Sequence, residues 1–220
     1  MAEISVDSLK RDPLELKLSK LISVKNELIG NQEKKELYFN QGIIETLLSM
    51  VGSEQNDKLL QEIVTVINCY FFDFPNSLEC FKIYSPTFIQ MHFFLQAYKD
   101  SPQLVDIVLK IIKNSITFGI VKVSDFENHS LIEELEPLMN SRSRISIIAR
   151  IVALLCQAEH FRQAVAQRKS VLEVILQQVT ENLLLISDEC LENCLSALAE
   201  ASKDNKENTL TIFTHQGFLE

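Results

Sequence analysis

The chain has 220 residues, of which 46% are hydrophobic, and it can therefore bury a substantial core as one large domain or as an array of small repeats. Its formal net charge of −9 and isoelectric point near 5.0 argue against a protein that wraps nucleic acid or adheres to anionic lipid, because either partner would be repelled. No apolar run is long enough to cross a bilayer, so we predict no nucleic-acid partner and no membrane insertion.

Helical periodicity runs through the whole sequence. Only five glycines and five prolines interrupt it, and the Asn-Gly and Asp-Gly dipeptides typical of hairpin turns do not occur. Apolar residues recur at i, i+3, i+4 and i+7 in long windows, which is the pattern of helices that bury one face. The predicted fold class is all-α.

Two glycines near the start, Gly30 and Gly42, bracket a short polar segment, QEKKELYFN. We expect Gly30 to close the preceding long helix in a left-handed C-cap. We expect Gly42 to permit a sharp break before the apolar helix IIETLLSMV. The same order of elements recurs in later parts of the chain: a short helix, a break, a medium helix and a long helix.

A pattern of three apolar residues recurs on the long helices. Its members are Leu60, Val64 and Ile67, then Leu104, Val108 and Ile111, then Ile148, Val152 and Leu155, then Leu191, Leu195 and Leu198. The steps between the first members are 44, 44 and 43 residues. The opening helix fits less well, because Leu18 and Ile22 match but Lys25 stands at the third apolar position.

Units of this composition and length are typical of armadillo repeats, with the paired-helix HEAT repeat as the near alternative. Each unit buries its apolar face only against its neighbours, which predicts a right-handed α-solenoid of three-helix repeats. We expect residues 1–220 to form a single array with about four complete repeats and partial repeats at both ends. Because the chain ends inside a unit, we expect it to be the N-terminal portion of a longer array.

The long third helix of each armadillo unit lines a concave groove, where polar positions can meet a partner. Setting aside the apolar triplets leaves these candidate protein-binding residues: Asn26, Thr65, Asn68, Lys110, Lys113, Asn114, Arg150 and Asn193. A ladder of asparagine amides could hold an extended chain by donating to and accepting from its peptide groups. Equally, each amide could satisfy a neighbouring helix end. The lysines and Arg150 predict that the groove receives an acidic or carboxylate-terminated peptide.

No catalytic or cofactor-binding motif is present, so we predict no enzymatic activity and no cofactor. Cys156 with His160, and Cys190 with Cys194, are each four residues apart and could share a helix face, but neither pair has the further ligands that a metal needs. The odd number of scattered cysteines predicts buried, reduced thiols in a protein of the cytoplasm or nucleus.

Two clusters have both a functional and a structural interpretation. The aromatic residues of YFFDF (70–74) and those that follow could stack on nucleic-acid bases, but few cations surround them, so helix core is favoured. These later aromatic residues are Phe81, Tyr84, Phe88, Phe93 and Phe94. The acidic run 132–139 contains Glu133, Glu134 and Glu136, and we expect a solvated helix face rather than a pair of catalytic acids.

The residues VKNELIGN (24–31), then Lys34, Lys35 and the break QGIIETLLSMV, resemble the first repeat of the armadillo-repeat subunit of the GID/CTLH ubiquitin ligase. This is the family of armadillo repeat-containing protein eight and its fungal vacuolar-import-and-degradation counterpart. A second similar stretch is LMNSRSR (138–144). The resemblance runs from about Asp12 to the end, although elsewhere it consists of helix spacing, and the irregular segment 119–130 departs from it.

This resemblance implies a non-catalytic scaffold that docks a substrate receptor onto the catalytic core of a RING-type ligase, in proteasome-dependent degradation. Its partners would be RING and LisH/CTLH-domain subunits. A nuclear-import adaptor is a competing interpretation, but such grooves use tryptophan, which this chain lacks, and lysines would repel a basic signal. A cadherin-type or small-GTPase-binding adaptor stays open.

Overall fold

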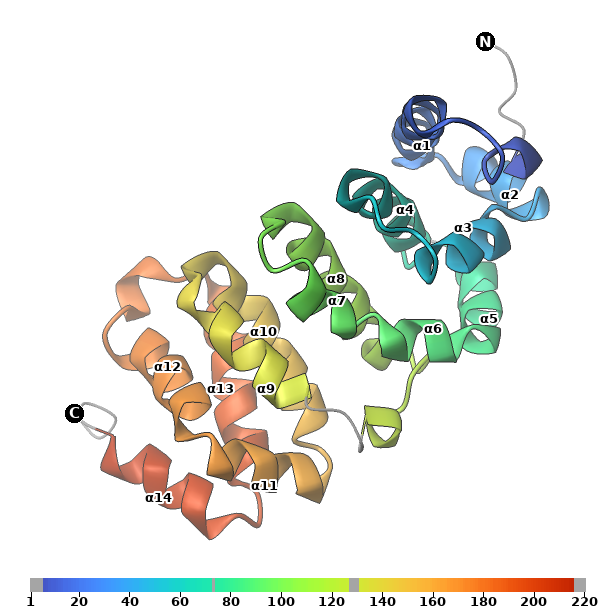
Figure 1. Ribbon diagram of the computed structural model, residues 1–220. Helices are drawn as coiled ribbons and strands as arrows, with labels where there is room; N and C mark the ends of the chain where they lie inside the picture. The colour runs from blue at the N-terminus through green and yellow to red at the C-terminus, as the bar shows by residue number, and fades with distance from the viewer. Residues whose placement is uncertain (1–5, 73, 127–130, 216–220) are drawn as a thin grey trace. The chain divides into compact units, whose positions relative to one another are not determined.

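The computed structural model describes residues 6–72, 74–126 and 131–215, and within these ranges it contains helices and no β-strand (Figure 1). The all-α prediction is confirmed. The backbone packs as two compact units, Met1–Val121 (unit 1) and Lys122–Glu220 (unit 2). The expectation of one continuous array over residues 1–220 stays a prediction.

Unit 1 is built around three long helices that pack in the order α1, α4, α8, with the shorter helices connecting them. Its elements are η1 (Val6–Ser8), α1 (Leu14–Leu28), α2 (Gln32–Asn40), α3 (Ile43–Val51), α4 (Asp57–Cys69), α5 (Pro75–Ile83), α6 (Ser85–Gln90), α7 (Phe93–Ala97) and α8 (Pro102–Thr117). α4 follows two shorter helices, as the sequence predicts, whereas α8 follows three, because the predicted middle helix of its repeat is divided into α6 and α7.

In unit 2 the long helices α10 and α13 pack closely along each other, and α12 packs against α13 and α14. The elements are η2 (Val123–Phe126), α9 (Leu131–Leu135), η3 (Glu136–Asn140), α10 (Arg142–Leu155), α11 (Glu159–Gln167), α12 (Lys169–Thr180), η4 (Leu183–Leu185), α13 (Asp188–Ser202) and α14 (Lys206–Thr214). The irregular segment predicted at 119–130 contains η2, and its last four residues lie outside the described ranges.

The apolar triplets on α4, α8 and α10 are fully buried, which confirms their assignment to the core. The triplet on α13 is wrong in register, since Leu195 is 46% exposed and Leu191 is only half-buried. The helix instead buries small residues along with Leu198: Cys190, Cys194, Ala197 and Ala201. Small side chains allow α13 to pack closely against α10. The predicted triplet was chosen by aligning leucines, so it selected the large side chains instead of the small buried ones.

The apolar triplet predicted on α1 is also displaced from the residues that the helix buries. Its buried residues are Leu21, Val24 and Leu28, whereas Ile22 is exposed and Lys25 is half-buried. α1 packs against α4 along one side, so its buried stripe is narrower than that of α4, which lies between α1 and α8.

Gly42 makes the predicted break between α2 and α3. It has a left-handed backbone, with φ +75°, and its N–H donates to the Phe39 carbonyl at 2.9 Å. Its own carbonyl accepts the first hydrogen bond of α3, from the Thr46 N–H at 3.1 Å. One residue therefore ends one helix and begins the next, and the left-handed conformation is what turns the chain.

Gly30 differs from the expected helix C-cap. Ile29 before it is extended, with φ −65° and ψ 114°, and Gly30 has φ +67°. The Asn31 N–H donates to the Leu28 carbonyl at 3.2 Å. These angles are those of a type II β-turn with glycine at its third position, so the helix ends before the glycine rather than at it.

Replacing Gly42 with valine should destabilise unit 1 by about 1–3 kcal/mol, because a β-branched residue resists the left-handed backbone. The atom nearest to an added Cβ is Oε2 of Glu45 at 3.7 Å, so the cost is one of conformation and not of collision. Urea unfolding followed by circular dichroism measures it. Gly52→Val is the control, since Gly52 has φ −77° and open space around it. Equal stability of the two variants would contradict the prediction.

The aromatic residues after Cys69 form a core, as expected. Phe81 is fully buried, and its ring centroid lies 4.8 Å from that of Phe71 and 5.0 Å from that of Phe88. Phe72 and Phe93 are exceptions, because about half of each side chain is exposed. The buried rings tie α5 and α6 to the residues that follow α4.

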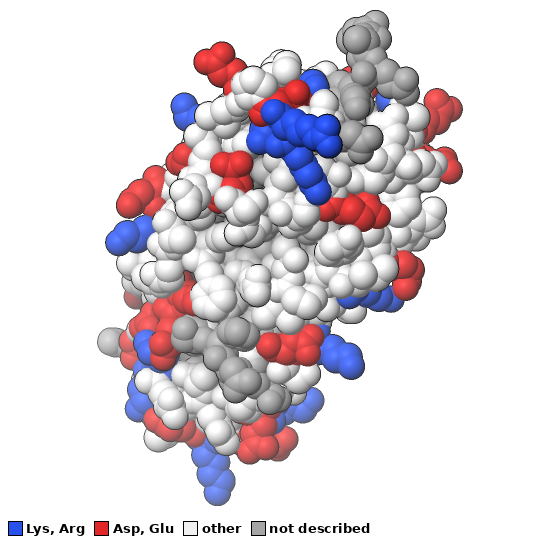
Figure 2. All heavy atoms as spheres, turned by 45° about the vertical axis from the view of Figure 1, so that its right-hand side comes forward, with Lys and Arg blue, Asp and Glu red and all other residues white. Residues whose placement is uncertain are grey.

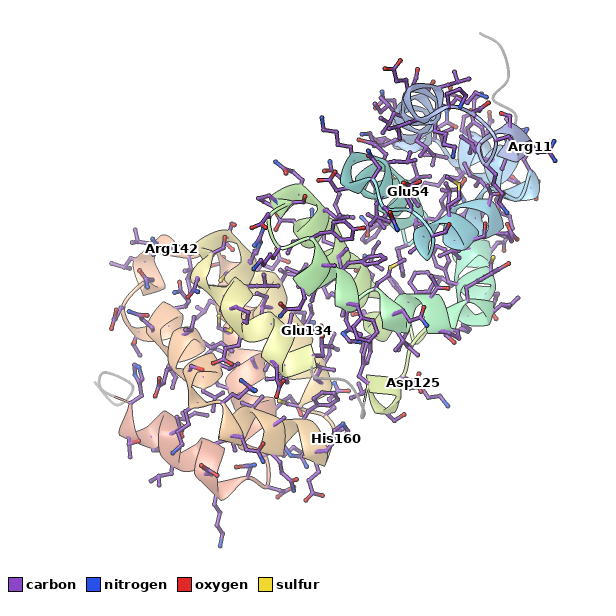
Figure 3. The ribbon with its side chains drawn as sticks, in the orientation of Figure 1. Arg11, Glu54, Asp125, Glu134, Arg142 and His160 are labelled. Carbon is purple, nitrogen blue, oxygen red and sulfur yellow. The ribbon has the colours of Figure 1, made fainter. Side chains whose placement is uncertain are left out.

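The acidic run is solvated only in part. Glu134 of α9 (Figure 3) is buried, contrary to the expectation of an exposed face. Four of the five residues of this one-turn helix are buried, so it has almost no free side. Glu133 and Glu136 instead bind Arg168, at 2.6 and 2.8 Å, and thereby hold the start of α12 against α9 and η3.

The carboxyl pKa of Glu136 is lowered by the hydrogen bond from Ser170 and by Arg168. Because the folded pKa is depressed, this contribution to stability is complete above the ordinary pKa of 4.5 and is lost as pH falls through the folded value. We expect an NMR titration of Glu136 to have its midpoint below 4.5, and Arg168→Gln to raise that midpoint. Lys82→Gln, which removes a distant pair with Glu79, should leave it unchanged. A midpoint insensitive to Arg168→Gln would contradict the assignment.

Candidate protein-binding surface

Polar side chains connect the three long helices of unit 1. The Lys25 ammonium on α1 lies 2.7 Å from the Glu62 carboxylate on α4. The Asn114 amide on α8 donates to the Asn68 side-chain oxygen on α4 at 3.2 Å. These contacts show which faces of the helices meet.

Other polar positions lie on the same faces, because residues three or four apart share one side of a helix. On α4 these are the positions from Glu62 to Asn68, and on α8 the positions from Lys110 to Asn114. We call the set the unit 1 polar stripe: Lys25, Glu62, Thr65, Asn68, Lys110, Lys113 and Asn114.

Two predicted binding residues in the stripe serve the fold. Asn114 is 2% exposed, and its contact with Asn68 joins α8 to α4. The Thr65 hydroxyl donates to the Gln61 carbonyl one turn earlier, at 2.6 Å. Asn68 is half-buried, and its oxygen is already bonded, so it offers a partner mainly its amide N–H groups.

The stripe keeps two available cations. Lys110 is exposed and Lys113 is half-buried, and in the described part of the chain neither forms an ion pair or a side-chain hydrogen bond. Both lie within a turn of Asn114 on α8. The positive charge on this helix is therefore free to meet an anionic group.

Asn26 stands apart from the stripe. It is exposed on α1, adjacent to Lys25, but consecutive residues on a helix point in different directions. Its neighbours three or four residues away, Ile22 and Ile29, are also exposed. No hydrogen bond joins Asn26 to Asn68 in the described part of the chain, and the asparagine ladder stays a prediction.

The remaining predicted residues belong to unit 2. The Asn193 amide on α13 donates to the Ser146 hydroxyl on α10 at 3.0 Å, so it joins the two helices. Arg150 follows Ser146 by one turn, is half-buried, and forms no ion pair with any residue that the structure describes. It is the available cation of this face.

Sequence reasoning missed Glu62 and Ser146, and it treated Lys25 only as a mismatch in the apolar triplet. A charged residue at an otherwise apolar position was the available signal, since such a residue needs a partner. The identity of that partner could not be inferred, because Glu62 lies 37 residues further along the chain.

Four of the five cysteines are buried, as expected, and Cys69 is half-buried. Burial raises the thiol pKa of Cys156 to about 12, and that of Cys194 to about 12. A thiol this hard to deprotonate is a poor nucleophile and a poor metal ligand. Among the residues that the structure describes, no three His, Cys, Asp or Glu side chains come together as a metal site, and no helix is long and apolar enough to cross a membrane.

Charges of both signs are interspersed over the face of the molecule drawn in Figure 2, and much of that face is uncharged.

Neither a protein-family model nor a curated protein sequence matches the chain. Among solved structures, it is similar to the designed armadillo repeat protein YIII(Dq)4CqI, with a TM-score of 0.69 and 14% identity over 94% of this chain and 84% of that one. The designed armadillo repeat protein YIII(Dq.V1)4CPAF, in complex with the peptide (KR)4, matches with a TM-score of 0.68, 14% identity and the same coverage.

A third similar structure was solved for a study of the conserved phosphorylation switch that controls the interaction between cadherin and β-catenin. It matches with a TM-score of 0.58 and 13% identity, over 94% of this chain and 46% of that one. At these identities the similarity shows the fold alone, which is that of an armadillo-like α-solenoid.

Proposed function

We propose that the chain is a non-catalytic protein-binding scaffold, and that the unit 1 polar stripe receives an acidic segment of a partner protein. The observation that carries the proposal is that Lys110 and Lys113 form no ion pair with any described residue and lie within a turn of Asn114, whose amide bonds to Asn68. Long third helices line the binding groove of armadillo solenoids.

The charge on α8 selects the class of partner. A designed relative in fold was solved with the basic peptide (KR)4, whereas lysines here would repel such a peptide and attract carboxylates. An exposed ion pair contributes only about 0.2–1 kcal/mol, so useful affinity requires several such contacts along an extended segment. Hydrogen bonds from the Asn68 amide to the peptide backbone add to them without reading its sequence.

We further propose that the parent assembly is a GID/CTLH-type ubiquitin ligase, in which the scaffold links a substrate receptor to the catalytic core. This proposal rests on the resemblance of residues 24–51 and 138–144. In the structure, several of those residues stabilise the repeat itself. Lys35 is buried and donates to the Phe72 carbonyl at 2.6 Å, and Lys34 pairs with Glu27 at 3.2 Å.

Affinity purification of the tagged chain from its own cells, with mass spectrometry, tests both levels of the proposal. RING and LisH/CTLH-domain proteins are expected in the purified complex. A complex that instead contains an import receptor, a cadherin tail or a small GTPase would contradict the proposal of a ligase subunit. It would still agree with the proposal of a protein-binding scaffold.

Charge reversal then tests the stripe. Lys110→Glu with Lys113→Glu should weaken binding of the co-purified partner, or of an acidic peptide taken from it, by about tenfold or more. The control is Lys58→Glu with Lys99→Glu, which changes the net charge equally at exposed positions outside the stripe. Arg150→Glu reports separately on unit 2. If the stripe variant and its control bind the partner equally well, the proposal for this surface is wrong.

A further inference from the structure

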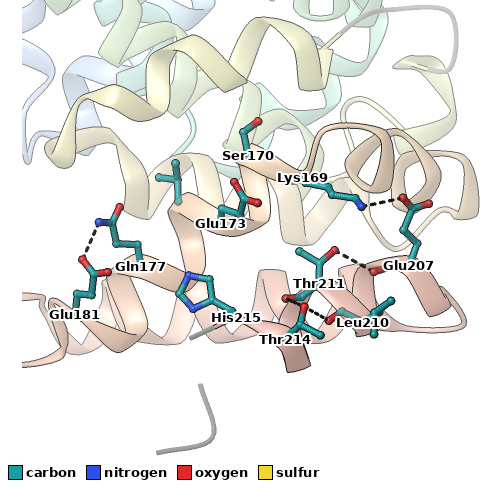
Figure 4. Close-up of a pocket in the computed structure, with 11 residues that line it drawn as sticks. Lys169, Ser170, Glu173, Gln177, Glu181, Glu207, Leu210, Thr211, Thr214 and His215 are labelled. Atoms are coloured by element: carbon teal, nitrogen blue, oxygen red, sulfur yellow. Dashed lines mark hydrogen bonds and ion pairs between the residues drawn. The ribbon is translucent and has the colours of Figure 1, made fainter. Parts of the chain in front are cut away.

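One ion pair of the unit 1 polar stripe is complete without a partner protein. The Lys25 ammonium on α1 lies 2.7 Å from the Glu62 carboxylate on α4, and the two side chains are only 24% and 13% exposed. A second interhelical pair, between Lys169 on α12 and Glu207 on α14 (Figure 4), is 3.6 Å long, and both of its side chains are more than half exposed. Solvent therefore screens the Lys25–Glu62 pair less, and within it the positive charge of Lys25 is cancelled.

The helices α4 and α8 lie side by side and point in the same direction. Where they begin, the Ser101 hydroxyl donates to the Asp57 carboxylate at 2.8 Å. Where they end, the Asn114 amide donates to the Asn68 oxygen at 3.2 Å. A residue on one helix can therefore be matched with a residue at the same height on the other.

Glu62 and Lys110 stand at nearly the same height on these two helices. Glu62 precedes Asn68 by about 9 Å along α4, at about 1.5 Å per residue, and Lys110 precedes Asn114 by about 6 Å along α8. Packed helix axes are about 8–10 Å apart, and physiological salt screens charges over about 8 Å. A carboxylate bound on α8 is thus largely screened from Glu62, whereas a carboxylate over α4 would lie beside it.

We propose that Glu62 decides where along the stripe the negative charge of a partner can lie, an inference that rests on the proposed function of the stripe. The acidic residues of the segment gather over Lys110 and Lys113 on α8, and uncharged residues lie over α4 and α1. A carboxylate over α4 could bind Lys25 only by displacing Glu62. The displaced carboxylate would be left partly buried and unpaired, which costs more than an exposed ion pair returns.

Two fluorescein-labelled peptides of about 12 residues, long enough in extended form to cross the three long helices, test this assignment against the full chain. Both consist of three glutamates among serines, and they differ only in order. The clustered peptide has its glutamates at alternate positions near one end, and it is made with the cluster at either end. The dispersed peptide has them spread over its whole length. In anisotropy titrations the better clustered peptide should bind about threefold to fivefold more tightly than the dispersed one.

Glu62→Gln keeps the shape of the side chain and releases Lys25. It should tighten binding of the dispersed peptide about threefold to fivefold and remove the preference for clustering. Glu207→Gln is the matched control, because it also releases a lysine from an interhelical pair and changes the net charge equally, but lies outside the stripe. It should leave the preference unchanged. Lys25→Gln combined with Glu62→Gln should bind both peptides as the unaltered chain does, and circular dichroism verifies that each variant is folded.

Equal affinity of the unaltered chain for the clustered and dispersed peptides would overturn the assignment, as would equal effects of Glu62→Gln and Glu207→Gln. A failure of the proposed function has a different signature. In that case neither peptide would show binding that Lys110→Glu with Lys113→Glu weakens, so the two failures are distinguishable.

Discussion

Replacing Asn208 with aspartate should destabilise unit 2 by about 3–5 kcal/mol at pH 7. Asn208 on α14 is fully buried, and its side-chain amide donates to the carbonyls of Arg162 at 2.9 Å and Ala201 at 2.8 Å. It thereby joins α14 to α11 and α13. Aspartate has the same shape, but a carboxylate would face two carbonyl oxygens with no hydrogen to donate.

Position along the helix offsets only part of this cost. Asn208 is the third residue of α14, where the helix dipole favours a negative charge by about 0.3–1 kcal/mol. Burial of an unpaired charge costs several times more, so destabilisation dominates. Asn208→Ala, which loses the hydrogen bonds without adding a charge, should cost only about 1–3 kcal/mol.

The pH dependence distinguishes a buried charge from a simple loss of packing. The pKa of the introduced carboxyl should be raised in the folded state, so its penalty is complete above that folded pKa. The penalty should disappear as pH falls below about 3.9, the ordinary value for aspartate. Urea unfolding of Asn208→Asp and Asn208→Ala between pH 3.5 and 7 measures the difference, and a difference independent of pH would contradict the assigned contacts.

Truncation of Phe81 to alanine should destabilise unit 1 by about 3–5 kcal/mol. The ring is fully buried between Phe71 and Phe88, so its removal loses the transfer free energy, the tilted contact with Phe71 and the edge-to-face contact with Phe88, and it leaves a cavity. Chemical unfolding monitored by circular dichroism gives the magnitude.

Phe93→Ala is the matched control, because the same side chain is 51% exposed on α7. It should cost about 1 kcal/mol or less. Phe81→Leu, which fills most of the volume, should fall between the two. Comparable losses for Phe81→Ala and Phe93→Ala would contradict a core centred on Phe81.

Local patterns in the sequence were sufficient for the helices and for most of the core. The triplets on α4, α8 and α10 are buried as predicted, since each of these helices presents a continuous apolar stripe. The prediction was wrong on α13, where packing against α10 favours Cys194 and Ala197 over the larger Leu195. A pattern of side-chain size cannot reveal how closely two helices will approach.

The candidate binding residues could be predicted only in part. Their positions on the long helices follow from periodicity, but their availability depends on contacts with other helices. Asn114 was expected to bind a partner, and it is instead buried against Asn68. Lys110, which forms no ion pair with any described residue, keeps its charge exposed.

The sequence by itself determined the all-α class, the length of the repeat and the break at Gly42. These depend on interactions within a few residues, namely the exposure of one helix face and the left-handed backbone that glycine tolerates. Only the tertiary structure decided that Lys25 pairs with Glu62, 37 residues away, and that Asn208 joins three helices. Such contacts depend on which helix faces meet and at what separation, and that follows from the packing of whole helices rather than from any local pattern.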